Sequence, residues 1–257
     1  MKTFTKNKKR NTVQKPYSMQ LAIILISAVW LFLSCEADLF NTGPKTTVNR
    51  TLNQFSYLLV EDIFDIELVQ ADTFGITIKA GSELIDNIEL QHAGDSLYIY
   101  NTSKARWSRQ YERPAIKVMF PTLKKITLHE PCNMQTSDTL HLDKLTIWAI
   151  ADVTELEMQI NANNLHLANA STSAGKYVLS GRVNYFATLI RGSGILEAGT
   201  LKAQGIHIRS RSIGDCHIWA TSSLDVYIEN TGKIYYLGAP TITNNTEETA
   251  NQLIPLE

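Results

Sequence analysis

The chain has 257 residues, 44% of them hydrophobic, which is enough for a sizeable core in one large domain or two small ones. Its net charge of −1 is unevenly distributed: residues 1–34 hold six basic and no acidic side chains, whereas residues 35–257 hold 18 basic and 25 acidic, a net charge of −7. Nucleic acids are bound by clustered Lys and Arg, so we expect no nucleic-acid partner.

The first predicted element is an apolar run from Leu21 to Leu33 that follows the basic N-terminus. A helix of this length would measure roughly 20 Å, too short for a bilayer core of about 30 Å. A basic segment followed by a short apolar run is typical of a signal peptide, which we place at residues 1–34. The alternative is a short buried helix.

Residues 32–35, Phe-Leu-Ser-Cys, resemble a bacterial lipobox, in which the cysteine is lipidated and becomes the mature N-terminus. Ser34 and Cys35 match that pattern, whereas Phe32 and Leu33 depart from its usual residues. Several acyl chains on one cysteine give a stable membrane anchor. We therefore expect Cys35 to be the lipid attachment site of an exported outer-membrane lipoprotein. Whether it faces the periplasm or the cell surface stays open.

Residues 35–50 contain Gly-Pro, Thr and Asn without an apolar period, which predicts a tether. From Thr51 onward apolar residues alternate with polar ones, as in "FDIEL" at 64–68, "FGITI" at 74–78, "SLYIY" at 96–100 and "AIKVMF" at 115–120. This period of two predicts β-strands. Residues 81–90, "GSELIDNIEL", fit either one helical turn or a further strand.

An internal repeat follows in the second half of the chain. Its units begin at Leu145, Leu165, Phe186, Ile206 and Val226, at spacings of 20, 21, 20 and 20, and Ile126 extends the series backward by 19. A constant period near 20, built from strands and glycine turns, predicts an all-β fold of the parallel β-helix or β-solenoid type. An antiparallel sandwich is the alternative, although sandwiches require no constant repeat.

The predicted organisation is one β-helix domain over residues 51–243, with a C-terminal tail at 244–257. In each unit two apolar residues flank an outward one, so Ile206 and Ile208 should point inward and His207 outward. Cys132 and Cys216 should lie about four rungs, or roughly 19 Å, apart, which is too far for a disulfide. We expect two buried free thiols.

The segments Phe55–Tyr100 and Ser223–Thr243 resemble the opening and the last coil of the putative auto-transporter adhesin, head GIN domain family. The first carries "ELIDNIEL" and "GDSLYIY", and the second carries Gly-x-apolar-x-Tyr-x-Gly-x-Pro from Gly232 to Pro240. Together they bracket about 190 residues. The resemblance implies a right-handed parallel β-helix on an exported, often lipid-anchored protein. It brings no catalytic residues, and of the family's Gly-Ser-Gly turns only Gly192-Ser193-Gly194 is intact.

The sequence offers no cofactor motif, and we expect no metal or catalytic site. His166 and His207 share an outward position but lie two coils apart, about 10 Å, too far for one metal ion. Glu197 and Asp215 are the best carboxylate pair that the repeat suggests, and a pair alone does not make a glycosidase. A carbohydrate-active β-helix enzyme, either a polysaccharide lyase or a glycosidase, remains the alternative. A groove with two facing carboxylates would favour it.

Two features could bind a ligand. Residues 101–114 place Lys and Arg beside aromatic residues, so Trp107, Arg109 and Tyr111 could stack on a glycan or pair with anionic groups; covering the end of the solenoid is the alternative role. The second feature is the outward column Thr146, His166, His207 and Tyr227, near Trp148 and Trp219, whose alternative is plain exposed sheet. The predicted function is a non-enzymatic, adhesin-like envelope protein that binds a glycan or a protein; a purely structural envelope role is a further alternative.

Overall fold

The computed structural model describes residues 42–102, 112–170, 172–244 and 247–257, and Thr42–Glu257 forms one unit. The predicted signal peptide 1–34, Cys35, and the proposed ligand-binding residues Trp107, Arg109 and Tyr111 lie outside the described residues. Within the described ranges no helix is both long enough and apolar enough to span a bilayer.

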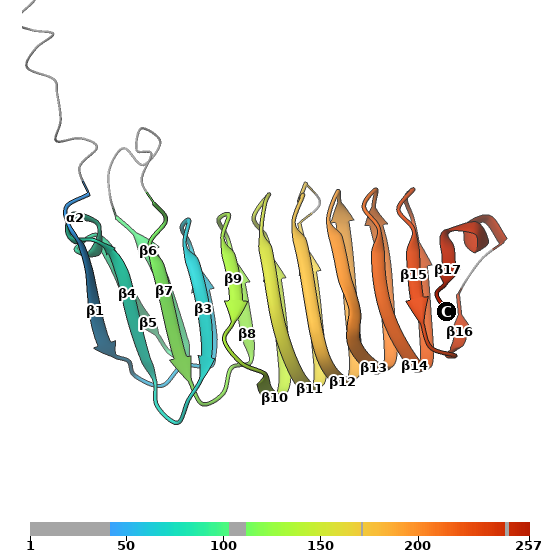
Figure 1. Cartoon of the computed structure of the whole chain (residues 1–257), viewed down its shortest axis with the longest axis horizontal. Helices are drawn as coiled ribbons and strands as arrows, with labels where there is room; N and C mark the ends of the chain where they lie inside the picture. Colours follow the sequence, from blue (N-terminus) through green and yellow to red (C-terminus); the bar gives the residue numbers. More distant parts are fainter. Residues whose placement is uncertain (1–41, 103–111, 171, 245–246) are drawn as a thin grey trace, which may run out of the picture. The chain divides into compact units, whose positions relative to one another are not determined.

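The N-terminal third combines parallel and antiparallel strands, with one helical turn, α2 (Ser82–Ile85). Antiparallel pairs form between β1 and β4, β4 and β7, and β5 and β6. The strands of this region are β1 (Lys45–Thr51), β2 (Tyr57–Val60), β3 (Asp65–Gln70), β4 (Gly75–Gly81), β5 (Ile88–Ala93), β6 (Ser96–Asn101) and β7 (Ala115–Phe120). The antiparallel strands lie at the end of the stack opposite the C-terminal strand, β17 (Leu253–Pro255) (Figure 1).

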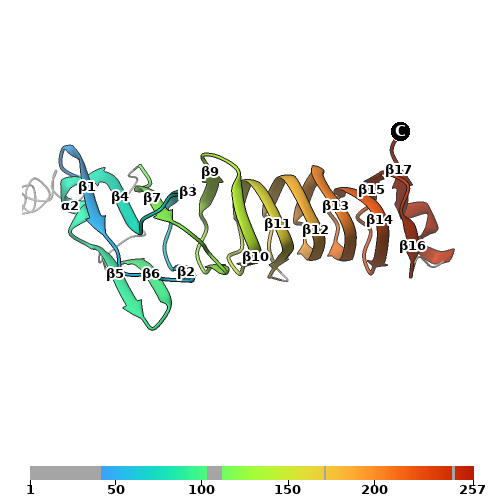
Figure 2. The ribbon, with the colours of Figure 1, turned by 90° about the horizontal axis from the view of Figure 1, so that it is seen from below.

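The rest of the unit is a parallel β-solenoid, and the whole fold has about six turns. Successive strands stack side by side along one axis (Figures 1 and 2). They are β8 (Lys125–Leu128), β9 (Asn133–Thr136), β10 (Leu140–Ala149), β11 (Glu155–Asn169), β12 (Lys176–Gly192), β13 (Ile195–Ser212), β14 (Cys216–Ile228), β15 (Ile234–Leu237), β16 (Thr241–Thr243) and β17 (Leu253–Pro255), with the 3-10 helix η2 (Glu247–Gln252) before β17. This arrangement confirms the predicted all-β solenoid.

Two faces of the solenoid matter for function, and we call them face A and face C. Face A contains β4, β7, β3 and β9, followed by the first residues of β11, β12, β13 and β14 and then β15. Face C contains β2, β8, the last residues of β10 to β14, and β16. The long strands β11, β12 and β13 therefore contribute to both faces.

The core is a single cluster of apolar side chains that lies inside the coils. Alternate residues of most strands supply it; in β13, for example, Ile206 and Ile208 are buried on either side of the half-buried His207. The parallel register stacks like on like, with Leu145 beside Leu165 and Leu165 beside Phe186. The predicted inward positions are confirmed, because a period of two places every second residue on the same side of a strand.

The turns that lead into face A depend on glycine and serine. The buried Ser212 hydroxyl donates to the Gly194 carbonyl at 2.8 Å and accepts from the Gly214 N–H at 3.0 Å. A Cβ atom on Gly214 would lie 2.5 Å from the Gly194 carbonyl oxygen of the preceding coil. Adjacent turns thus approach so closely that a side chain does not fit there.

The register corrects two of the predicted alignments. Ile126 pairs with Ile147 rather than Leu145, so the spacing there is 21 and not 19. Ile206 pairs with Leu224 rather than Val226, a spacing of 18. The β13–β14 pairing contains irregularities between Ala198 and Lys202 and again at Ala203–Gly205. Such irregularities shift the register without changing the inward or outward direction of the apolar residues, so the sequence pattern alone does not reveal them.

The ends of the domain differ from the prediction. Residues 45–50, expected in the tether, belong to β1, which pairs with β4 and lies almost wholly exposed. An exposed edge strand buries no apolar face, so it lacks the alternation that marks a strand. The expected C-terminal tail contains β17, which pairs with β15 and buries Leu253. Residues 81–90 contain both alternatives, the single turn α2 and the start of β5.

Candidate functional site

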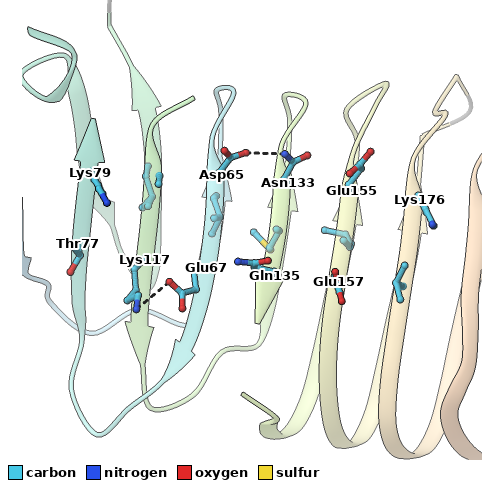
Figure 3. Close-up of a pocket in the computed structure, with 16 residues that line it drawn as sticks. Asp65, Glu67, Thr77, Lys79, Lys117, Asn133, Gln135, Glu155, Glu157 and Lys176 are labelled. Carbon is cyan, nitrogen blue, oxygen red and sulfur yellow. Dashed lines mark hydrogen bonds and ion pairs between the residues drawn. The ribbon is translucent and has the colours of Figure 1, made fainter. Parts of the chain in front are cut away.

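A groove of about 590 Å³, lined by both polar and apolar residues, lies on face A. Six strands form its floor in the spatial order β4, β7, β3, β9, β11 and β12 (Figure 3). β3 and β7 come from the N-terminal third, whereas β11 and β12 belong to the repeat. The groove therefore spans the junction between the two halves of the solenoid.

Two rows of outward side chains run across these strands. The register gives the first row as Lys79, Ala115, Asp65, Asn133, Glu155 and Lys176, and the second as Thr77, Lys117, Glu67, Gln135, Glu157 and Val178. The residues between them, such as Ile66 and Leu156, point into the core. Strand alternation thus places ten polar or charged groups on one surface, and neighbouring rungs lie about 4.8 Å apart.

The negative charges of the two carboxylates on β3 are compensated by neighbouring side chains. Glu67 forms an ion pair with Lys117 at 3.1 Å and accepts a hydrogen bond from the Ser137 hydroxyl. The hydrogen bond from Ser137, with a smaller contribution from Lys117, outweighs burial and lowers the pKa of Glu67. Asp65 accepts a hydrogen bond from Asn133 at 2.9 Å and lies 3.8 Å from the Arg113 guanidinium. These two groups stabilise the fold and carry little uncompensated charge.

The carboxylates on β11 are different. Glu155 and Glu157 are both exposed, and neither side-chain carboxylate forms a hydrogen bond or an ion pair with any residue that the structure describes; the Glu155 backbone N–H donates to the Cys132 carbonyl. The Gln135 side chain beside Glu157 and the Lys176 side chain beside Glu155 are likewise unpaired within the described ranges. The β9–β11–β12 end of the groove therefore offers acceptors and donors that a ligand can use.

The groove holds the facing carboxylates that would favour a glycosidase. Glu155 and Glu157 are two residues apart on one strand, about 7 Å, and catalytic carboxylates lie about 5–10 Å apart. However, a general acid is kept protonated at neutral pH by an apolar enclosure, and both side chains are open to solvent. The two carboxylates therefore have the spacing of a glycosidase site but lack its apolar enclosure.

The predicted column on face C is only partly correct. Thr146 pairs with His166, then Ala187 and His207 follow, so the two histidines are two strands apart as predicted. Asp225, and not Tyr227, occupies the next position and lies 2.7 Å from His207 Nδ1. Among the described residues no group of three His, Cys, Asp or Glu side chains is placed to hold a metal ion.

The aromatic residues near that column do not form one surface. Trp148 lies on face C and is 47% exposed. The Lys125 ammonium lies over its ring, 5.0 Å from the ring centroid. Trp219 lies at the end of the face A segment of β14, opposite Lys202, whose ammonium is 5.1 Å from its ring. The register thus separates two residues that the sequence suggested together.

The carboxylate pair Glu197 and Asp215 is not a site either. Glu197 pairs in register with His217, and the His217 Nδ1 lies 3.2 Å from its carboxylate. Asp215 accepts the backbone N–H of Lys233 in the next turn at 2.8 Å. Each carboxylate therefore has a structural partner of its own.

Cys132 and Cys216 are free and buried, as predicted. Burial raises the pKa of each thiol to about 12. Because the thiolate is the reactive form, neither side chain is suited to nucleophilic chemistry or metal binding.

The fold and the groove define a non-globular class of protein, a parallel β-solenoid with an elongated polar face. The chain belongs to the putative auto-transporter adhesin, head GIN domain family, whose model matches residues 54–240. No curated protein matches the sequence.

Solved structures share the fold. A putative adhesin from Bacteroides fragilis is 22% identical, with a TM-score of 0.72 over 77% of this chain and 91% of that one. A putative adhesin from Parabacteroides merdae is 16% identical, with a TM-score of 0.56 over 78% and 92%. A putative lipid binding protein from Parabacteroides distasonis is 21% identical, with a TM-score of 0.57 over 78% and 92%. At these identities the likeness establishes the fold alone.

Proposed function

We propose that this protein is a non-catalytic, lipid-anchored module of the cell envelope that binds a surface ligand through the face A groove. Membership of an adhesin family supports the binding role. The observation that carries it is the unpaired polar end of the groove, at Glu155, Glu157, Gln135 and Lys176. Polar groups left unpaired on a sheet are available to a ligand, and because the backbone is already ordered, binding costs side-chain entropy but little backbone entropy.

The anchor rests on Cys35 and the signal peptide before it. The resemblance of residues 32–35 to a lipobox supports outer-membrane attachment. A Cys35→Ala variant should lose its acyl chains and move from the membrane to the soluble fraction. Cys132→Ala, a change at a buried thiol, is the control and should stay with the membrane. If both variants stayed with the membrane, the anchor would lie elsewhere.

Cell attachment tests the binding role. Cells that produce the protein should be retained on immobilised glycans or envelope proteins more strongly than cells that lack it. Equal retention of both strains on every surface would contradict an adhesin-like function and favour a structural envelope role.

A second candidate is a carbohydrate-active enzyme, which the spacing of Glu155 and Glu157 favours. It predicts that the purified protein releases shorter oligosaccharides from a polysaccharide, and that Glu157→Gln abolishes the release. Binding without any new chain ends would support the non-catalytic function.

A further inference from the structure

The groove is suited to an elongated occupant held by side chains. It crosses six strands, which gives five intervals of about 4.8 Å, or roughly 24 Å along the solenoid. Every one of these strands is paired on both sides, because β1 borders β4 and β13 borders β12. Extended peptides usually bind by adding a strand at a free sheet edge, and the groove has none.

The groups at the unpaired end favour hydroxyl-rich ligands over lipids. Gln135, Glu155 and Glu157 present unpaired amide and carboxylate groups on adjacent rungs (Figure 3). The Asn133 amide donates one N–H to Asp65 and presents its oxygen beside them. Such groups accept from and donate to hydroxyls, often at two points. An acyl chain in the same place would desolvate them without supplying a partner, which costs free energy.

The charge at this end of the groove favours hydroxyl-rich ligands that also carry positive charge. The Glu155 and Glu157 carboxylates lack a partner among the described residues, whereas the carboxylates on β3 are compensated by Arg113 and Lys117. Lys176 is the one cation beside them in register. The net charge of −7 over residues 35–257 adds a long-range attraction for cations.

We propose that the groove binds a linear glycan that carries protonated amines, with the amines at Glu155 and Glu157 and the hydroxyls at Asn133 and Gln135. This inference rests on the proposed function and names the ligand class of the same groove. Charge complementarity supplies the selectivity, and the row of amides and carboxylates supplies the fit along the chain. Binding should weaken as salt is added, because the carboxylates are exposed.

The test is calorimetric titration of the full-length protein in detergent with a β-1,4-linked glucosamine hexamer at mildly acidic pH, where ordinary carboxylates remain ionised. The N-acetylated hexamer has the same length and hydroxyls but no charge. We expect the amine form to bind at least tenfold more tightly, and E155Q/E157Q to remove that advantage. The matched control, E89Q/E130Q, removes two exposed carboxylates outside the groove and should bind as the wild type does.

Three outcomes would overturn the inference. Equal binding of the two hexamers would remove the charge selectivity, and unchanged binding by E155Q/E157Q would place the ligand elsewhere. Binding of a lysine-rich peptide, but of neither hexamer, would make the ligand class wrong. These results concern only the ligand class and leave the proposed function untouched. The proposed function is contradicted by a different result, namely cell retention that does not depend on the protein.

Discussion

At the scale of single residues, direction into or out of the coil decides what a substitution does. Ile208 is fully buried in β13 and stacks between Thr188 and Val226 in the neighbouring coils. A charge there has no partner, so Ile208→Asp should lower the free energy of unfolding by at least about 3 kcal/mol. Thermal or denaturant unfolding measures it.

Gln204→Asp is the control for that variant, because Gln204 is exposed on the same strand. Its effect should stay within about 0.5 kcal/mol, as for most surface substitutions. If Ile208→Asp were equally mild, the inward assignment of the repeat would be wrong.

Asp225 gives the molecule an acid-sensitive contact between the last coils. Burial alone would raise its pKa, but hydrogen bonds from Asn244, His207 and Thr243 outweigh burial and hold the pKa below its usual range. A lowered native pKa stabilises the fold above the unfolded pKa, and this stabilisation is lost as the pH falls through the native pKa.

Asp225→Asn should therefore lower the melting temperature most near neutral pH. The gap to the wild type should close as the pH falls below the ordinary range of Asp. Melting curves across that range measure it. A gap that does not change with pH would mean that Asp225 is stabilising only through its shape.

At the scale of elements, the turns limit the sequence more strictly than the strands do. Gly214→Ala should be destabilising by roughly 1–3 kcal/mol, since its Cβ would meet the Gly194 carbonyl. Gly199→Ala is the matched control, because its Cβ would meet only His217 Cβ at 3.8 Å. Denaturant midpoints compare the two variants; equal midpoints would show that the turns can separate at little cost.

The elements also show how far the sequence could predict the fold. Strand β3 (Asp65–Gln70), which the alternation over residues 64–68 predicted, and the register of Leu145 with Leu165 followed from apolar periodicity. The pairing of Ile206 with Leu224 did not, because register irregularities leave the period of two intact. β1 was missed because an exposed edge strand needs no apolar face.

At the scale of the whole molecule, the groove could not be predicted because its strands are not consecutive. β3 lies between β7 and β9 in the sheet, although β4, β5 and β6 separate it from β7 in the sequence. The alternation in "ELEM" at 155–158 is a signal that could have placed Glu155 and Glu157 on one face of a strand. Their neighbours Asn133 and Gln135, and the compensated carboxylates Asp65 and Glu67, became visible only through the topology.

Protease treatment of intact cells, followed by detection of this protein, tests whether the module lies outside the cell. An envelope module that binds ligands outside the cell must be accessible there, so we expect the full-length protein to disappear while a periplasmic marker stays intact. Full protection of the protein, with cleavage only after the cells are lysed, would contradict a surface-binding function.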